Sequence, residues 1–556
     1  MSKNSMAKKA TALLLCGVAA LSMAACGGGG GFRRDDSSEE YDPTKTYLNV
    51  GNYNGGLGYA WLREVADKYE AAHPDVKIKI NNEKDKYMDA TLLEQMGNYG
   101  NDMYFVNAIT YQTYVARGKV ADITDVVTEN IEGESESIED KMNETLREYY
   151  KTADNKYYAV PFFDGIFGTV YDVDLFEGEG LYFNSNGKLI CDDPTNTTLS
   201  KGPNGIEGDY DDGLPATYTE WKTLLNGIKS FSYTPYIWTG EHEFYRYRWL
   251  AAAWADYEGK ENFDLNTSFS GSYTFEGDEE PTDITINNAY LLQKQQGKKY
   301  ALDMAEYIVR NNMYVKTSFD SINTHTMAQK SFLQSVETSQ MSEGTQRVAM
   351  IFEGGWWENE AKDFFNEMAD VYANEDYAFG TRKFGFMPMP KSDDGKSAGG
   401  TTLISSTGNS VVFVCEDSKL KDLAKDFLQF AHSDESLRTF TRVTGSIRPY
   451  DYTLEESDKT NMTHYAKNMW DIYHNENAKI SYVTLYENNA FLEETSYLGV
   501  NGCEWWWRST IGSASYIDAF YEFSQEKTLT AEKYYNGLQS TFSETKWKEK
   551  MKDHLK

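Results

Sequence analysis

Tryptophans follow several hydrophobic segments of the chain, and their rings have the most specific binding chemistry in the sequence. Trp356 and Trp357 end the segment RVAMIFEGGWW, Trp238 ends a short aromatic strand, and Trp506 is the middle residue of three consecutive tryptophans. Aromatic rings stack on the apolar faces of ligands as well as on one another. These four residues are therefore candidates for stacking on a ligand, with packing in a core as the alternative for each.

Four polar residues complete the candidate set: Asn52, Tyr53, Asn107 and Asp164. Asn52 and Tyr53 lie in the Gly-rich loop after the first predicted strand, and Asn107 directly follows another predicted strand. Loops at the carboxyl ends of parallel strands are the usual ligand sites of α/β proteins. Asp164 interrupts a hydrophobic segment, where a carboxylate needs a partner. A ligand hydroxyl, a loop amide or an arginine such as Arg382 would serve.

Sequence signatures of catalysis and of cofactor binding do not occur in the chain. It contains no GxSxG and no HExxH, and the Gly-rich loop 51–58 does not lead into GK[ST]. We expect no cofactor and no metal; calcium at Asp209–Asp212 stays open beside the alternative of a solvated acidic loop. A hydrolytic carboxylate pair such as Glu353 with Asp164 is conceivable, but carboxylates are so numerous that one pair carries little weight.

The N-terminus has the order of a bacterial export signal. Lysines precede a short hydrophobic segment, and Met-Ala-Ala-Cys follows it, which resembles a lipobox. Residues 1–25 are predicted to be a lipoprotein signal peptide, Cys26 the lipidated residue, and residues 26–45 a flexible Gly-rich tether. Because no later segment is long and apolar enough to cross a bilayer, we expect a protein anchored on the extracytoplasmic face of the cell membrane.

The charge balance excludes one class of partner. The formal net charge is −32, whereas nucleic acid binding requires clustered Lys and Arg to neutralise phosphates. Beyond the signal and the anchor, Cys191, Cys415 and Cys503 are widely spaced, so no zinc-ligand pattern and at most one disulfide are expected.

The elements that must position these residues alternate between strands and helices. Residues 47–50 and 76–80 are predicted strands on either side of a helix over 59–72, the β-α-β pattern of a parallel sheet. The stretch Tyr157–Glu177 has the composition of a buried strand but is broken by a proline and an Asp-Gly pair. It is therefore expected to cross between two sheets over a cleft.

Six segments, taken in order, resemble the extracellular solute-binding proteins of family 1, which serve carbohydrate ABC transporters. The segments are YYAVPFFDGIFGTVYDVDLFE, LPATYTEW, RVAMIFEGGWW, FGFMPMPK, SVVFV…AKDFLQFAHSDESL and TGSIRPY. The resemblance runs from about Tyr47 to the C-terminus and leaves out a polar insertion at 178–213. It implies that Trp356 occupies the position of a stacking tryptophan.

The resemblance also implies an α/β, two-lobed periplasmic-binding-protein-like fold of type II, similar to maltose-binding protein, with a ligand cleft between the lobes. Crossings between the lobes are then expected near 158–168, 384–391 and 443–450. The implied lobes are 46–160 with 385–445 for lobe one, and 161–384 with 446–556, including the insertion, for lobe two.

The implied function is that of the membrane-anchored substrate-binding component of an ABC importer, a monomer that delivers a sugar or oligosaccharide to permease subunits. An extracellular glycoside hydrolase and a binding protein for a peptide or a polyamine are the alternatives. The identity, length and linkage of the sugar do not follow from the sequence.

Overall fold

A computed structural model describes residues 41–107, 109–337, 346–405, 410–482 and 503–552. The chain divides into two compact units, residues 1–42 and 43–556, and the architecture below is that of the second unit. The predicted signal peptide, Cys26 and most of the tether lie outside the described residues. Within the described part, no helix is long and apolar enough to cross a membrane.

A five-stranded sheet organises the first lobe, by which we mean this sheet and the helices packed on it. Its order is β2 (Val76–Glu83), β1 (Thr46–Tyr53), β3 (Met103–Val106), β12 (Val411–Val414) and β4 (Val160–Pro161). β1 runs parallel to β2 and β3, whereas β12 runs antiparallel to β3 and β4. Every residue of β3 and β12 is buried, as expected for apolar strands in the middle of a covered sheet.

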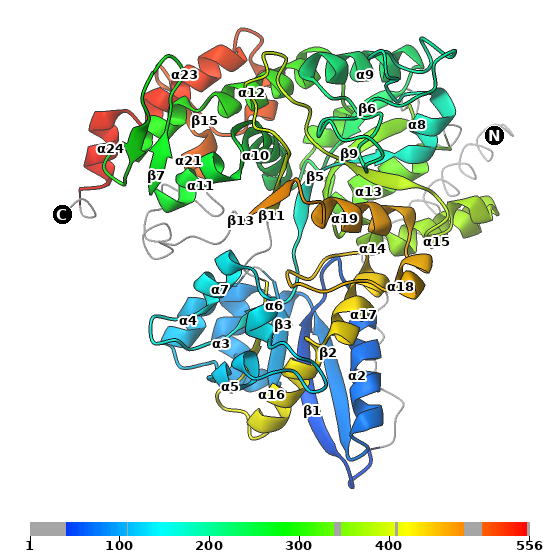
Figure 1. Ribbon diagram of the computed structural model, residues 1–556, viewed down its shortest axis with the longest axis vertical. Helices are drawn as coiled ribbons and strands as arrows, with labels where there is room; N and C mark the ends of the chain where they lie inside the picture. The colour runs from blue at the N-terminus through cyan, green and yellow to red at the C-terminus, as the bar shows by residue number, and fades with distance from the viewer. Residues whose placement is uncertain (1–40, 108, 338–345, 406–409, 483–502, 553–556) are drawn as a thin grey trace, which may run out of the picture. The chain divides into compact units, whose positions relative to one another are not determined.

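Helices from two distant parts of the sequence cover this sheet, and Figure 1 shows the blue and cyan helices beside the yellow ones. The N-terminal group is α2 (Ala60–Ala72), η1 (Asp85–Tyr87), α3 (Asp89–Tyr99), α4 (Tyr111–Ala116), α5 (Thr124–Thr128), α6 (Ile138–Lys141) and α7 (Glu144–Tyr150); the later group is α16 (Lys421–Phe430) and α17 (Asp434–Thr444). α17 packs against α2. The ring of Trp61 on α2 contacts Phe440 on α17 edge to face, with the ring centres 5.0 Å apart.

A six-stranded sheet organises the second lobe, defined in the same way. Its order is β13 (Ala478–Tyr482), β11 (Thr401–Ser405), β5 (Ile166–Asp172), β9 (Val348–Gly354) and β6 (Thr234–Ile237), and β10 (Phe384–Met387) also pairs with β5. β5 is antiparallel to β9, β10 and β11, while β6 and β9 are parallel. β5 and β9 are buried along their whole length.

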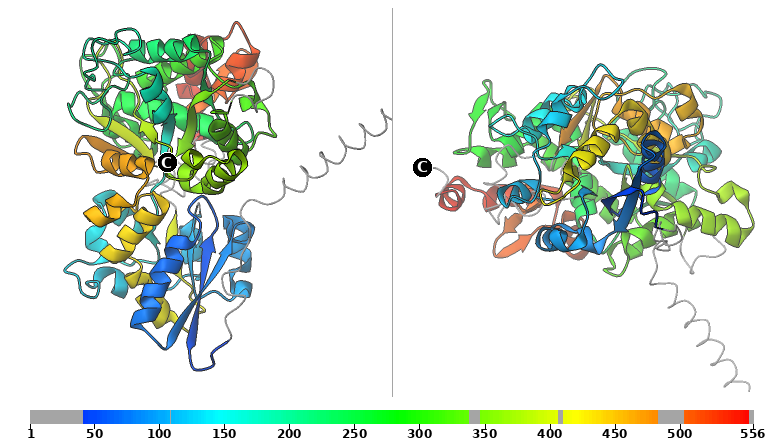
Figure 2. Two further views of the ribbon diagram at one scale, coloured as in Figure 1. Left: turned by 90° about the vertical axis from the view of Figure 1, so that its right-hand side faces the viewer. Right: turned by 90° about the horizontal axis from the view of Figure 1, so that it is seen from below.

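The second lobe carries most of the remaining helices (Figures 1 and 2). These are α8 (Val173–Glu179), α9 (Tyr218–Ser230), α10 (Phe244–Glu258), α11 (Lys260–Ser268), η2 (Ala289–Lys294), α12 (Gln296–Arg310), η3 (Lys316–Phe319), α13 (His325–Gln334), α14 (Trp357–Glu360), α15 (Lys362–Tyr372), η5 (Glu375–Tyr377), α19 (His464–Tyr473), α21 (Cys503–Trp507), α22 (Ala519–Gln525), α23 (Ala531–Thr541) and α24 (Glu544–Lys550). The short helix α18 (Glu456–Thr460) packs instead against α17 of the first lobe. Two hairpins add β7 (Gly271–Tyr273) with β8 (Thr282–Ile284) and β14 (Ser509–Ile511) with β15 (Ala514–Tyr516). α10 is buried nearly all round, which marks it as the central helix of this lobe.

Three chain segments run side by side between the sheets. Ser405 pairs with Ile166 in the second sheet, and Val411 pairs with Pro161 in the first. Asp164 lies between these two points and bridges to Ile447. The crossing expected near 158–168 and the one expected near 443–450 therefore lie next to each other.

The remaining crossing differs from the sequence expectation of 384–391. β10 and β11 both pair with β5, so residues 384–405 belong to the second sheet, and the chain joins the first sheet only at β12. Phe384-Gly-Phe-Met is as apolar as a crossing strand, and its prolines follow it instead of interrupting it. The sequence pattern alone therefore did not distinguish an edge-pairing strand from a crossing one.

The insertion at 178–213 forms turns that pack on the second lobe. Isolated bridges join Phe183 to Leu189 and Asn184 to Leu199. Phe183 and Leu189 are buried in the core of the second lobe, and the Tyr210 hydroxyl lies 3.2 Å from the Thr401 hydroxyl of β11.

Candidate functional site

Trp356 lies where the two lobes meet. It follows the buried strand β9 and precedes α14, and it packs against the hydrophobic cores of both lobes. Its ring is edge to face with Phe163, at 6.2 Å between ring centres, and tilted against Phe167 at 6.3 Å. Phe163 belongs to the core of the first lobe and Phe167 to that of the second. Unlike its neighbour Trp357, Trp356 is only partly buried.

The Gly-rich loop after β1 approaches Trp356 closely. A Cβ atom on Gly56 would lie 2.8 Å from Cδ1 of Trp356 and 3.2 Å from Cβ of Glu360, so only glycine fits without displacement. The Asn359 amide donates to the Gly56 carbonyl at 2.7 Å. Backbone of the first lobe is thus in direct contact with α14 of the second.

Tyr53 and Asn107 stand in this same region. A Cβ on Gly55 would lie 2.8 Å from the Tyr53 ring and 3.8 Å from the Asn107 amide nitrogen. Burial, and then the charges of Glu360 and Asp85, raise the pKa of Tyr53, so it stays a hydroxyl at neutral pH. The Asn107 amide oxygen is buried and makes no hydrogen bond, which leaves an acceptor for a ligand hydroxyl. The structure therefore brings Tyr53, Asn107 and Trp356 together.

Asn52 has a different position from its neighbour Tyr53. It is 2% exposed, and its amide donates to Asn82 at 2.8 Å and to the Gly58 carbonyl at 3.1 Å. These bonds hold the end of β2 and the Gly-rich loop together. The geometry fits a residue that shapes the loop carrying Tyr53.

A carboxylate pair adjoins Trp356 on the second lobe. The Gln329 amide donates to Glu353 at 3.0 Å and to Glu360 at 2.7 Å. Burial, reinforced by the charge of Glu360, raises the pKa of Glu353 well above its ordinary value. Burial also acts to raise the pKa of Glu360, but His325 and Gln329 outweigh it and lower that pKa. The pKa values of the two neighbouring carboxyls are therefore shifted in opposite directions, and both oxygens of Glu353 accept hydrogen bonds, from Gln329 and from the Gly354 amide.

Asp164 sits at the crossing itself and is 3% exposed. The Tyr473 hydroxyl donates to its Oδ2 at 2.8 Å, and Ser405 and Tyr482 also face it. Burial raises the pKa of the carboxyl to about 6. The partners are hydroxyls; Arg382 donates to Asp172 at 2.8 Å instead. The structure thus places Asp164 among hydroxyl partners at the crossings, whereas Arg382, considered as its partner from the sequence, pairs with Asp172.

Three of the tryptophans expected at a sugar site are buried in cores. Trp238 is 0% exposed and stacks on Phe352, with ring centres 5.1 Å apart at an angle of 12°. Trp357 is 0% exposed and contacts Phe384 at 5.0 Å. Trp506 is 1% exposed and packs edge to face on Trp254 at 5.7 Å, and both its neighbours in sequence are buried as well. In this structure all three are therefore core residues, each buried against other aromatic side chains.

The acidic loop of the insertion satisfies most of its own carboxylates. Asp209 accepts amide hydrogens from Asn204 at 2.8 Å and from Asn475 at 2.9 Å, and Asp211 accepts the Asn204 backbone amide at 3.0 Å. Burial, and then the charges of Asp209 and Asp212, raise the pKa of Asp211 to about 7. This loop ties the insertion to the second lobe.

Sequence reasoning did not find several residues that surround Trp356. Phe163 and Phe167 were read only as parts of a strand, Tyr245 as part of a helix, and Gln329 and Glu360 carried no motif. Tyr245 is 3% exposed, and its pKa is raised by burial, Glu353 and Glu360. The one available signal was the short spacing of Glu353, Trp356 and Glu360, which puts them at one strand end.

Two α/β sheets joined by adjacent crossings, with candidate residues where the lobes meet, define a two-lobed periplasmic-binding-protein-like fold, as the sequence predicted. The model of the family described as bacterial extracellular solute-binding protein matches residues 55–437. The chain belongs to this family. No curated protein matches it.

Solved structures of similar fold include proteins whose titles name a carbohydrate ligand. The apo form of RafE from Streptococcus pneumoniae is 14% identical with a TM-score of 0.52, covering 91% of this chain and 100% of that one. A chitin oligosaccharide binding protein is 15% identical with a TM-score of 0.52, covering 90% and 99%. Lmo0181 from Listeria monocytogenes, in complex with cycloalternan, is 14% identical with a TM-score of 0.50, covering 90% and 99%.

Proposed function

We propose that this solute-binding protein captures a sugar or oligosaccharide where its two lobes meet and delivers it to the permease subunits of an ABC importer. The observation that carries the proposal is Trp356, a partly buried indole that packs against both hydrophobic cores. An aromatic plate in contact with both lobes suits a ligand that joins them. Two of the similar structures have titles that name a chitin oligosaccharide and cycloalternan, which supports the same ligand class.

The chemistry of the region suits carbohydrate. Trp356 offers an apolar face, and Tyr53 offers a hydroxyl donor. The Asn107 oxygen and the ionised Glu360 offer acceptors. A ligand that contacts groups of both lobes stabilises the arrangement in which they are close, because its affinity for that state is higher.

Membrane attachment completes the proposal. A lipid on Cys26 would hold the protein at the extracytoplasmic face, with residues 26–45 as a tether between the anchor and β1. The chain would act as a monomer beside its permease. Metabolic labelling with a palmitate analogue tests the anchor: the wild type should take up the label and Cys26→Ala should not.

Thermal unfolding with a panel of oligosaccharides tests the ligand class. The mature chain should unfold at a higher temperature with at least one glycan, and ligand at about 100 times its Kd adds about 2.7 kcal/mol of stability. Trp356→Ala should abolish most of this shift. Trp357→Phe, a change in the adjacent core tryptophan, is the matched control and should keep the ligand-induced shift even if its own melting temperature falls.

The alternative functions, which are binding of a peptide or polyamine and hydrolysis of a glycoside, would give different results with the same panel. A shift with peptides or polyamines, and none with any glycan, would contradict the sugar assignment. Release of new reducing ends from the panel would instead indicate a glycoside hydrolase. The Glu353 and Asp164 pair considered from the sequence is then tested by Glu353→Gln.

A further inference from the structure

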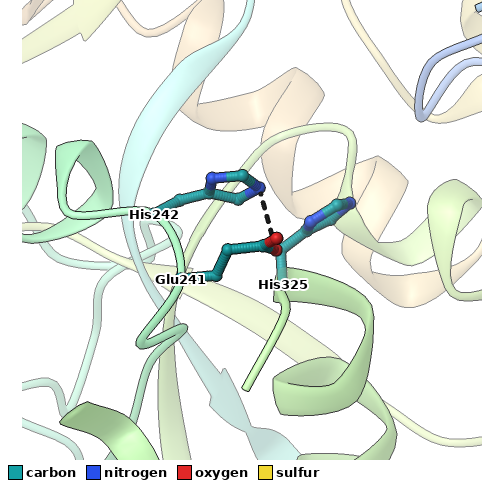
Figure 3. A group of neighbouring side chains, drawn as sticks. All are labelled: Glu241, His242 and His325. Atoms are coloured by element: carbon teal, nitrogen blue, oxygen red, sulfur yellow. Dashed lines mark ion pairs between the residues drawn. The ribbon is translucent and has the colours of Figure 1, made fainter. Parts of the chain in front are cut away.

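Glu241, His242 and His325 form a compact trio beside the region described above. Each contributes one nitrogen or carboxylate oxygen, and these atoms all lie within 4.8 Å of one another; the described residues hold no other such group of three. Figure 3 shows the three side chains next to one another, with a dashed line between His242 and Glu241. His242 Nε2 lies 3.3 Å from Glu241 Oε2. His325 is distant in sequence from Glu241 and His242, so no sequence motif predicts the group.

Asn323 holds the two halves of the trio together. Its backbone carbonyl accepts the amides of Gly240 at 3.0 Å and Glu241 at 3.2 Å and the Thr239 hydroxyl at 2.9 Å. Its side chain donates to the Trp238 carbonyl at 3.1 Å. The loop after β6 is therefore fixed against the residue that lies just before α13. The three side chains stand on a preformed scaffold, as a binding site requires.

Gly240 allows this close approach. A Cβ atom there would lie 2.2 Å from the Asp320 carbonyl oxygen, a distance that no side chain tolerates. The glycine that separates the Trp238 strand end from Glu241 therefore lets the loop reach the turn before His325.

His325 has the orientation of a metal-binding imidazole. Its Nε2 lies 3.5 Å from Glu360 Oε1. Its Nδ1 is buried and makes no hydrogen bond. Metal-bound histidines usually donate the second ring nitrogen to a carboxylate, which fixes the ring and its tautomer. Glu360 fills that position here and leaves Nδ1 as the free donor atom.

Charges around the trio are balanced for a cation. Lys84 and the carboxylates of Glu241 and Glu360 all act electrostatically on His242. Lys84 is the opposing positive charge, and Glu241 and Glu360 supply two negative ones. Because carboxylates outnumber ammonium groups here, the local charge favours a bound divalent cation.

We propose that Glu241, His242 and His325 bind a divalent transition-metal ion of the Zn²⁺ type, with Glu360 orienting His325. Two imidazoles and one carboxylate are a donor set that zinc accepts and that calcium and magnesium, which prefer oxygen donors, do not. Three protein ligands leave a coordination position for water. All three lie on the second lobe, so the site does not depend on the identity of the proposed sugar.

Calorimetric titration of ZnCl₂ into the tag-free mature chain is the direct test. We expect one saturable site, retained in a hundredfold excess of Ca²⁺ and Mg²⁺. X-ray absorption at the zinc edge should show nitrogen and oxygen neighbours at about 2.0–2.2 Å and no sulfur. This second measurement uses the unmodified protein and so does not depend on any variant folding.

Variants locate the site. His242→Ala and His325→Ala should each weaken Zn²⁺ binding more than Glu360→Gln, which should weaken it by about 10- to 100-fold. His73→Ala is the matched control, because His73 is a partly exposed histidine on the first lobe, and it should bind like the wild type. Unchanged affinity in the His242→Ala, His325→Ala double variant, or a spectrum with oxygen neighbours alone, would overturn the proposal.

Discussion

Asp164 combines deep burial with a position at the crossings. Its carboxyl is 3% exposed, and burial raises its pKa to about 6, against about 3.9 for an unperturbed aspartate. Because the folded-state pKa lies above the unfolded one, folding takes up a proton between about pH 4 and pH 6. Stability from this group is complete below pH 4 and is lost as the pH rises through 6.

The Asp164→Asn variant should therefore gain stability relative to the wild type as the pH rises. Relative to the wild type, the variant should gain roughly 3 kcal/mol of unfolding free energy between pH 4 and pH 8, because the amide carries no charge to desolvate. Urea unfolding at several pH values measures this difference. Asp67→Asn, with a side chain 63% exposed, is the control. If the difference in unfolding free energy between the wild type and Asp164→Asn did not change with pH, ionisation of Asp164 would not be its cause.

A separate experiment tests whether Asp164 contributes to glycan binding. If Asp164 contacts ligand, Asp164→Ala weakens glycan binding while the fold remains intact, as we expected from the sequence. Its hydroxyl partners Tyr473 and Tyr482 come from α19 and β13. An effect confined to stability would leave it as a residue that joins the crossings.

At the scale of elements, Asp172 links one helix to two strands. Its Oδ1 accepts the Leu175 amide at 3.0 Å and so caps α8, while its Oδ2 accepts from Arg347 and Arg382 at 2.8 Å each. The side chain is 1% exposed. Removal of one partner from a buried ion pair leaves an uncompensated charge.

Asp172→Ala should lower the unfolding free energy by about 3–5 kcal/mol. Asp172→Asn keeps an oxygen for the helix cap and should fall between this variant and the wild type. Asp67→Ala, which breaks an exposed pair with Arg63, should cost less than about 1 kcal/mol. Denaturant midpoints followed by tryptophan fluorescence measure all three. Equal midpoints for the two alanine variants would contradict this role.

The elements show how far the sequence could predict the structure. The strands predicted at 47–50 and 76–80 correspond to β1 and β2, and both strands extend three residues further, to Tyr53 and Glu83. Their existence could be predicted because apolar residues recur in a strand pattern at both places. The return crossing was misplaced, because hydrogen-bond pairing partners are not encoded in a local pattern. Trp356 and Trp357 are adjacent and equally apolar, so only the start of α14 decides which ring enters the core.

At the scale of the whole molecule, Gly56 controls how closely the lobes approach. Its missing side chain lets the loop after β1 touch Trp356 and Glu360. A methyl group there overpacks the contact, and overpacking typically costs about 1–3 kcal/mol. That cost applies only while the lobes touch, so it favours arrangements in which they are apart.

Gly56→Ala should therefore weaken ligand binding by about 5- to 150-fold and increase the radius of gyration of the ligand-free chain in X-ray scattering. Each lobe should keep its own fold, since no core residue changes. Gly97→Ala is the control, because a Cβ there meets no atom within 4 Å on the exposed side of α3. Unchanged scattering and unchanged affinity would show that the loop adjusts without moving the lobes.

The place of β12 between β3 and β4 also sets an order of events during synthesis. The ribosome makes β1 to β4 early, yet the strand that joins β3 to β4 follows every strand of the second sheet except β13. Until then β3 has an unpaired edge, which invites pairing with other chains. The lobe that begins first is completed late, so the nascent chain needs protection from aggregation until Val411 and its neighbours emerge.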